Sequence, residues 1–107
     1  MPQPFLKTYL QELNQTLEQI RPEESEAFVD ELHGALRRGS FIFICGNGGS
    51  GATASHFAAD LNKGVSYGRS RRFKVVSLND NIPTITAYAN DVSYEDVFVE
   101  QLKNFLS

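Results

Sequence analysis

The feature that most constrains the fold is a short apolar run that ends in a glycine-rich loop. Residues 41–45 (Phe-Ile-Phe-Ile-Cys) are typical of a strand buried on both faces of a parallel sheet. The next six residues, Gly46 to Gly51, contain four glycines, and a helical pattern then runs from Ala52 to about Lys63. A strand that leads through such a loop into a helix can hold an anion, because glycine lets backbone N–H groups approach a ligand closely.

A second strand is predicted at residues 73–78, after a polar and basic loop over residues 64–72. A short helix is expected after Pro83 and an amphipathic helix over residues 94–106. This order predicts an α/β fold, with the first βαβ unit of a doubly wound parallel sheet and a right-handed crossover. Two strands are fewer than the roughly four to six of a usual sheet. We therefore expect the rest of the sheet to lie outside this chain or to come from another chain.

Two amphipathic helices are predicted before the first strand. Apolar residues recur at helical spacing from Phe5 to Ile20, and Arg21-Pro22 ends this pattern because a residue before proline avoids the helical region. The second helix begins near Pro22 and closes with Arg37 and Arg38. We expect residues 1–38 to form a helical pair for oligomerisation, and residues 39–107 to form the α/β segment.

Composition narrows the class of protein. The net charge is −3 with no basic excess, which argues against nucleic acid as the main partner. The longest apolar run, residues 41–45, is far shorter than the roughly 20 residues of a membrane span. The N-terminus has no signal-peptide pattern, and the single cysteine, Cys45, allows no internal disulfide. We expect a cytoplasmic protein, with Cys45 as a buried small apolar residue.

The glycine loop has two interpretations from its residues alone. It can bind phosphate through its free N–H groups, or it can be a tight turn in which Ser50 caps the following helix. Nucleotide-binding fingerprints do not fit, because no Gly-Lys-Ser/Thr follows and the glycine spacing is not G-x-G-x-x-G.

The complete string from Cys45 to Leu61 resembles sedoheptulose-7-phosphate isomerases of the SIS (sugar isomerase) superfamily. The similarity lies in Gly-Asn-Gly-Gly-Ser at residues 46–50, followed six positions later by His-Phe-Ala at residues 56–58. A second similar stretch runs from residue 86 through Asn-Asp at residues 90–91 to Tyr-Glu-Asp-Val-Phe at residues 94–98. The likeness covers nearly the whole chain.

The resemblance implies an aldose–ketose isomerase that acts on a phosphosugar such as sedoheptulose 7-phosphate, for lipopolysaccharide and related glycans. It implies a doubly wound α/β domain that assembles as a homotetramer, with no membrane or nucleic acid partner. By position, it assigns binding of the sugar phosphate to Asn47, Gly48, Gly49 and Ser50, and binding of the sugar hydroxyls to Asn90 and Asp91. It assigns a zinc ion to His56 and Asp60, and the role of catalytic base to Asp60.

The residue types at positions 56 and 60 suit that chemistry. His56 and Asp60 are four residues apart, so both project from one helical face and can share a divalent ion. Moving a carbonyl between two carbons needs a base that carries a proton through an enediol. The alternative is a surface His–Asp pair that stabilises the helix by a few tenths of a kcal/mol.

The sequence departs from the isomerase pattern in two ways. Asp60 stands where the family usually has glutamate, so its carboxylate is one methylene shorter. The family's second half, with its main phosphate loop and further acid–base residues, has no counterpart up to Ser107. We therefore expect the isolated chain to be an incomplete and inactive isomerase. The alternative is a non-catalytic SIS module that binds a sugar phosphate or a regulated protein.

Overall fold

The computed structural model describes residues 2–106, with side chains from Pro4 to Leu106. Met1 and Ser107, the outer ends of the two predicted segments, lie outside the described part. Internal contacts divide the chain into two units, residues 1–34 and residues 35–107. No helix in the described part is both long enough and apolar enough to cross a lipid bilayer.

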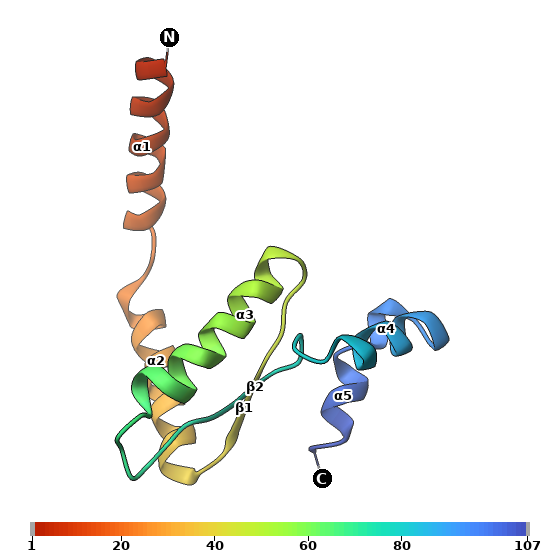
Figure 1. The fold of residues 1–107 in the computed structure, drawn as a ribbon. Coiled ribbons are helices and arrows are strands. Elements are labelled where there is room, and N and C mark those ends of the chain that lie inside the picture. Colours follow the sequence, from red (N-terminus) through yellow and green to blue (C-terminus); the bar gives the residue numbers. More distant parts are fainter. Residues whose placement is uncertain (1, 107) are drawn as a thin grey trace. The chain divides into compact units, whose positions relative to one another are not determined.

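The first unit consists of helix α1 (Pro2–Glu18) and most of helix α2 (Pro22–Arg38). The predicted break at Arg21-Pro22 is confirmed, since α2 begins at Pro22, whose ring suits the first turn of a helix. Acidic residues occupy the first turn of α2 and arginines its last turn, so both ends complement the helix dipole. Figure 1 shows α1 and α2 as successive helices joined by a short link.

The second unit contains two parallel strands with helices between and after them. Phe41 lies opposite Lys74 and Ile44 opposite Ser77, so the predicted parallel α/β arrangement is confirmed (Figure 1). In chain order, the elements of this unit after α2 are β1 (Phe41–Ile44), α3 (Gly49–Ala59), the π-helix η1 (Asp60–Val65), β2 (Lys74–Ser77), α4 (Ile82–Asp91), the 3₁₀-helix η2 (Tyr94–Asp96) and α5 (Val99–Lys103).

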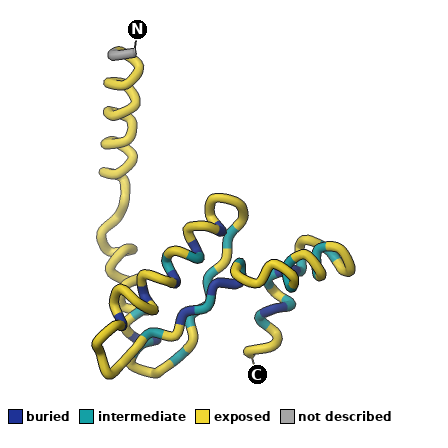
Figure 2. Tube along the Cα trace, in the orientation of Figure 1, coloured by how far each residue is buried: buried dark blue, intermediate teal, exposed yellow. Residues whose placement is uncertain are grey.

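The core of the second unit is small and lies around β2. Figure 2 shows buried positions on α3, β2 and α5, while α1 is exposed from residue 4 to residue 18. Helix α3 contributes Ala54 and Ala58, whose small side chains let the helix lie close to the sheet. From the C-terminal end, the ring of Phe105 lies 5.1 Å from that of Phe43 on β1.

Two predicted helices differ from those observed. The helix expected to run to Lys63 changes at Asp60 from α to π geometry, and Asn62 in this wider turn pairs with the edge of β2. The Asn62 amide donates to the Val75 carbonyl at 2.8 Å and accepts from the Val75 N–H at 3.0 Å. The single helix expected over 94–106 is instead η2 followed by the short α5, with Val97 and Phe98 as turn residues between them.

Candidate functional site

The glycine loop connects the carboxyl end of β1 to the first turn of α3. Gly48 is the N-cap residue of α3 and has φ of 55°, a left-handed conformation that glycine adopts at little cost. Ser50 is therefore the second residue of the helix, and no side chain caps its first turn. The expectation that Ser50 occupies the N-cap position is wrong, because the left-handed turn at Gly48 starts the helix two residues earlier.

Close packing explains why the loop needs glycine at Gly46 and Gly51. A Cβ atom on Gly46 would lie 2.6 Å from the carbonyl of Ser50, and one on Gly51 would lie 2.9 Å from the Asn79 side chain. Asn79 follows β2 and bonds both backbone groups of Gly46: its Oδ1 accepts from the N–H at 2.9 Å and its Nδ2 donates to the carbonyl at 2.6 Å. One asparagine thus holds the strand end and the loop together.

The outer side of the loop is open. A Cβ atom on Gly48 or Gly49 would meet no atom within 4 Å, and residues 47–50 are all exposed. The first N–H groups of an α-helix have no partner within the helix, and in α3 no side chain supplies one, although the Ser50 N–H donates to the Asn47 carbonyl at 2.9 Å. Together with the helix dipole, these groups make the loop accessible to an anion.

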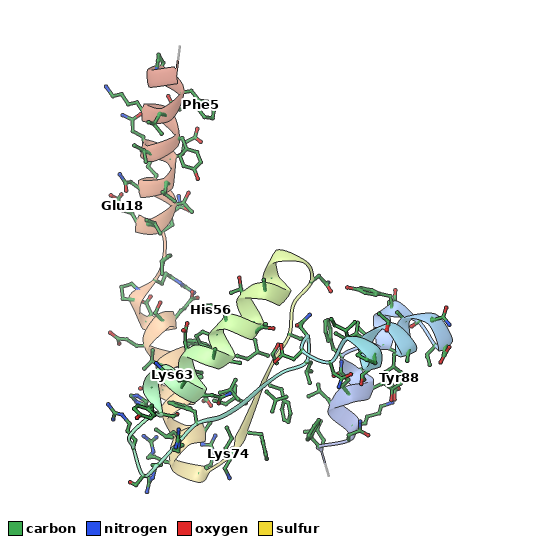
Figure 3. The ribbon with its side chains drawn as sticks, viewed as in Figure 1. Phe5, Glu18, His56, Lys63, Lys74 and Tyr88 are labelled. Carbon is green, nitrogen blue, oxygen red and sulfur yellow. The ribbon has the colours of Figure 1, made fainter. Side chains whose placement is uncertain are left out.

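His56 and Asp60 lie next to each other on the outer face of α3. His56 Nδ1 and Asp60 Oδ2 are 3.2 Å apart, and the two side chains are 80% and 61% exposed. Figure 3 labels His56 on this helix. Asp60 is also the residue at which the α-helix gives way to the π-helix η1. π-helical turns are rare and are often found at functional sites.

A zinc site needs three or four protein ligands, usually in tetrahedral geometry. His56 and Asp60 supply two donors with suitable spacing, but no cluster of three or more potential ligands exists among residues 2–106. These two residues alone do not complete a zinc site.

Asn90 and Asp91 end helix α4. The Asn90 side-chain amide donates to Asp91 Oδ1 at 3.0 Å, and both side chains are exposed. Within the described residues, no hydrogen bond joins them to the glycine loop. The connection comes from Tyr94 in η2, whose hydroxyl donates to Asn47 Oδ1 across 47 positions of sequence.

Of the predicted site residues, only Asp91 lines either of two cavities in this unit. A cavity of about 540 Å³ beside β2 is lined by α3, α5 and the β2–α4 link, including Ser55, Asp80 and Asn104. A second cavity of about 530 Å³ includes Tyr88 and Asp91. Neither contains the glycine loop or His56. Residues 47–50, His56 and Asp60 are exposed on the surface of this unit.

Sequence reasoning assigned no role to Asn79 or Tyr94, the two side chains that reach the glycine loop. The position of Asn79 near the loop could have been predicted, because polar residues that follow parallel strands meet at the carboxyl edge of the sheet. Tyr94 carried no such signal, since its position depends on the turn between α4 and η2. Cys45, expected to be buried, is exposed because the chain leaves the sheet at this residue.

Similarity to known proteins agrees with this geometry. The SIS domain family model matches residues 8–106. The phosphoheptose isomerase of Helicobacter pylori is 40% identical over 91 residues, which are 85% of this chain and 46% of that protein. The lincomycin biosynthesis protein LmbN of Streptomyces lincolnensis is 38% identical over 87 residues, covering 81% of this chain and 32% of that protein.

The fold matches as well. The structure of the phosphoheptose isomerase of Neisseria gonorrhoeae superimposes with a TM-score of 0.80 at 28% identity, covering 97% of this chain and 54% of that one. The chain thus spans between a third and about half of the length of these relatives. With its glycine loop, its parallel βαβ unit and a family match along almost its whole length, the chain belongs to the SIS domain family and is phosphoheptose isomerase-like.

Proposed function

We propose that this chain carries one half of a phosphosugar site, and that the complete site performs an aldose–ketose isomerisation on a sugar such as sedoheptulose 7-phosphate. The observation that carries the proposal is the open glycine loop at the N-terminus of α3. Its uncapped N–H groups and the space beside Gly48 and Gly49 suit a phosphate group. Asn47 and Ser50 would add side-chain contacts to the phosphate, and Asn90 and Asp91 would bind sugar hydroxyls.

In the proposed reaction, Asp60 acts as the base. It would take a proton from the carbon next to the carbonyl and return it to the former carbonyl carbon, while a hydroxyl proton moves between the two oxygens. The sugar is rearranged with no net change in its atoms. The Asp60 side chain is exposed and not buried in the fold, so a substrate can reach it.

We also propose His56 and Asp60 as two ligands of a zinc ion. Because the described residues supply only these two donors, the remaining ligands would have to come from outside residues 2–106. A zinc titration followed through the His56 imidazole NMR signals tests the proposal, and unchanged signals would contradict it.

The binding proposal is tested by an NMR titration of the chain with sedoheptulose 7-phosphate. Unphosphorylated sedoheptulose and NAD serve as controls for the sugar and for nucleotide binding. We expect shifts centred on residues 47–50 with the phosphorylated sugar alone. A folded chain whose loop signals ignore the sugar phosphate would contradict the half-site.

A second candidate function is a non-catalytic module that binds a sugar phosphate or a regulated protein. The observation in its favour is Asp60, whose shorter carboxylate is already 3.2 Å from His56 Nδ1. In general-base catalysis, the oxygen of the base must lie within about 3 Å of the carbon that loses the proton, or reach it through one bridging water. Assay of a complete protein that carries this segment separates the two: isomerisation lost in Asp60→Ala favours the enzyme, and sugar-phosphate binding without turnover favours the module.

Self-association is proposed from helix α1. Its large apolar side chains are exposed to between 42% and 74%, which is unfavourable for a helix in water; they are Phe5, Leu6, Tyr9, Leu10, Leu13 and Leu17. Together with the family resemblance, this face supports a homo-oligomer, with a tetramer as the expected form. Sedimentation equilibrium checks this, and a monomeric mass at micromolar concentration would count against it.

A further inference from the structure

Tyr94 makes the one side-chain hydrogen bond that joins the C-terminal helices to the exposed face of the glycine loop within residues 2–106. Its hydroxyl donates to Asn47 Oδ1, although the two residues are 47 positions apart. Asn79 also reaches the loop, but it bonds the backbone of Gly46 at the inner side. The Tyr94 contact therefore acts on a side chain that faces the proposed ligand.

In this structure the Oδ1 end of the Asn47 amide faces the Tyr94 hydroxyl. A side-chain amide has one acceptor end and one donor end, and free rotation would present either of them. Because the Tyr94 hydroxyl donates to Oδ1, the Nδ2 group with its two N–H donors is directed away from the tyrosine. In the described part, Nδ2 has no acceptor, so both donors are available.

Donors are what a phosphate or sugar oxygen needs. If the side-chain Oδ1 of Asn47 faced a phosphate, its partial negative charge would lie against the negatively charged phosphate oxygens. An amide held with Nδ2 outward adds to the uncapped N–H groups at the start of α3. Preorganising the donor also removes the cost of fixing the side chain when the ligand binds.

Tyr94 is itself held firmly enough for this role. The Ser93 hydroxyl donates to Asp96 Oδ2 at 2.5 Å across the turn of η2, and the Val97 side chain that follows is 1% exposed. Gln101 then ties this segment to the end of β2, since its Nε2 donates to the Leu78 carbonyl at 3.0 Å and to the Val97 carbonyl at 2.8 Å. The Tyr94 ring thus extends from an anchored segment to the loop.

We propose that Tyr94 is a positioning residue that holds the Asn47 amide with its N–H donors toward an anionic sugar. The inference rests on the proposed phosphosugar site. It predicts that Tyr94 acts on ligand affinity only through Asn47. It also assigns the C-terminal turn a part in binding that is separate from the sugar contacts proposed for Asn90 and Asp91.

The test is a double-mutant cycle in the 107-residue chain, with binding of sedoheptulose 7-phosphate measured by NMR. Tyr94→Phe removes only the hydroxyl, and we expect it to weaken binding about threefold to tenfold, the usual effect of one hydrogen bond. The Asn47 side-chain amide signals should shift and broaden even without ligand. Tyr67→Phe, the same change at a tyrosine that is 78% exposed, should leave both measurements unchanged.

The second arm uses Asn47→Ala as the background. If Tyr94 acts through Asn47, adding Tyr94→Phe to Asn47→Ala should weaken binding no further. An equal loss in both backgrounds would overturn the inference, because it would mean a direct contact with the ligand or a general loss of structure. Wild-type affinity in Tyr94→Phe would overturn it as well. If the wild-type chain ignores the sugar phosphate, the proposed function fails first and this inference fails with it.

Discussion

The two units of this chain are stabilised in different ways. In residues 35–107, side chains bond backbone groups far away in sequence, as Asn79 does with Gly46 and Asn62 does with Val75. In the described part of residues 1–34, the side-chain hydrogen bonds are local: Thr8 and Thr16 bond carbonyls four residues back, and Arg21 bonds Glu24.

This contrast means that the two units depend on different interactions for their stability. Long-range bonds fix the glycine loop within the second unit, so its geometry follows from this chain. Helix α1 has helical periodicity but exposes its apolar face, and most of the stability of a helix in a protein comes from packing of such a face. We therefore expect its order to come from burial of that face in the proposed oligomer. Four predictions test this contrast.

The largest effect is expected at Gly46. In Gly46→Val, the new Cβ would lie 2.6 Å from the Ser50 backbone, so the loop must deform or the unit must unfold. We expect a loss of about 3 kcal/mol in the free energy of unfolding, measured with urea. The NMR signals of residues 5–17 should change little, because the contacts of α1 are local.

Gly49→Val is the matched control for this substitution. A Cβ atom on Gly49 meets nothing within 4 Å, so the same change should cost less than about 1 kcal/mol. Equal losses for the two variants would mean that general loop flexibility, and not the close approach at Gly46, determines stability.

The second prediction concerns the apolar face of α1. If Leu13 is buried in an oligomer, Leu13→Asp removes about 2 kcal/mol of apolar burial and should raise the dissociation constant about 30-fold. Sedimentation equilibrium measures this. Gln15→Asp adds the same charge about 160° around the helix, on its polar side, and should leave the oligomer intact. A similar fall in mass for both variants would indicate charge repulsion, and no fall for either would show that this face is not the interface.

The third prediction concerns Asn79, which joins β2 to the glycine loop. Asn79→Ala removes two hydrogen bonds to Gly46 and leaves the half-buried Gly46 N–H unpaired. This should lower the free energy of unfolding by about 1–2 kcal/mol. Asn62→Ala removes an equivalent pair of bonds at the other end of β2. Both should lower the unfolding midpoint, but only Asn79→Ala should weaken phosphosugar binding. Equal binding losses would mean that stability alone controls the loop.

The sequence predicted most of what depends on local pattern. The helix break at Arg21-Pro22 and the parallel pairing follow from proline geometry and the crossover rule, and the structure confirms them. The first strand is confirmed over Phe41–Ile44, but it is not buried on both faces as predicted, since this chain leaves Phe41 exposed. The family resemblance is also confirmed. Its roles for His56, Asp60, Asn90 and Asp91 stay predictions, because they depend on a ligand.

Features that depend on distant contacts were not predictable in this way. The π turn at Asp60 brings Asn62 to the edge of β2, and no periodicity in residues 52–63 indicates it. The N-cap at Gly48 depends on a left-handed conformation that several glycines of the loop could adopt equally well. The contact between Tyr94 and Asn47 needs the whole path through β2, α4 and η2.

The smallest effect is expected at Arg21, in the link between α1 and α2. Its guanidinium bonds Glu24 Oε1, with Nε at 3.1 Å, but the two side chains are 66% and 63% exposed. Exposed ion pairs usually contribute between zero and about 1 kcal/mol, because water and salt screen the charges and two long side chains must be ordered. Arg21→Ala should therefore lower stability by only a few tenths of a kcal/mol, as measured by hydrogen exchange of the α2 amides.

The size of that effect bears directly on the contrast between the two units. If local charge pairs contribute little, burial of the exposed apolar face of α1 is the proposed source of the order of this helix. Glu24→Gln should match Arg21→Ala, and about 1 M salt should remove the difference from wild type. A loss above about 1 kcal/mol that survives high salt would reverse the interpretation. The helical pair would then be stabilised from within, and self-association would no longer be needed to explain it.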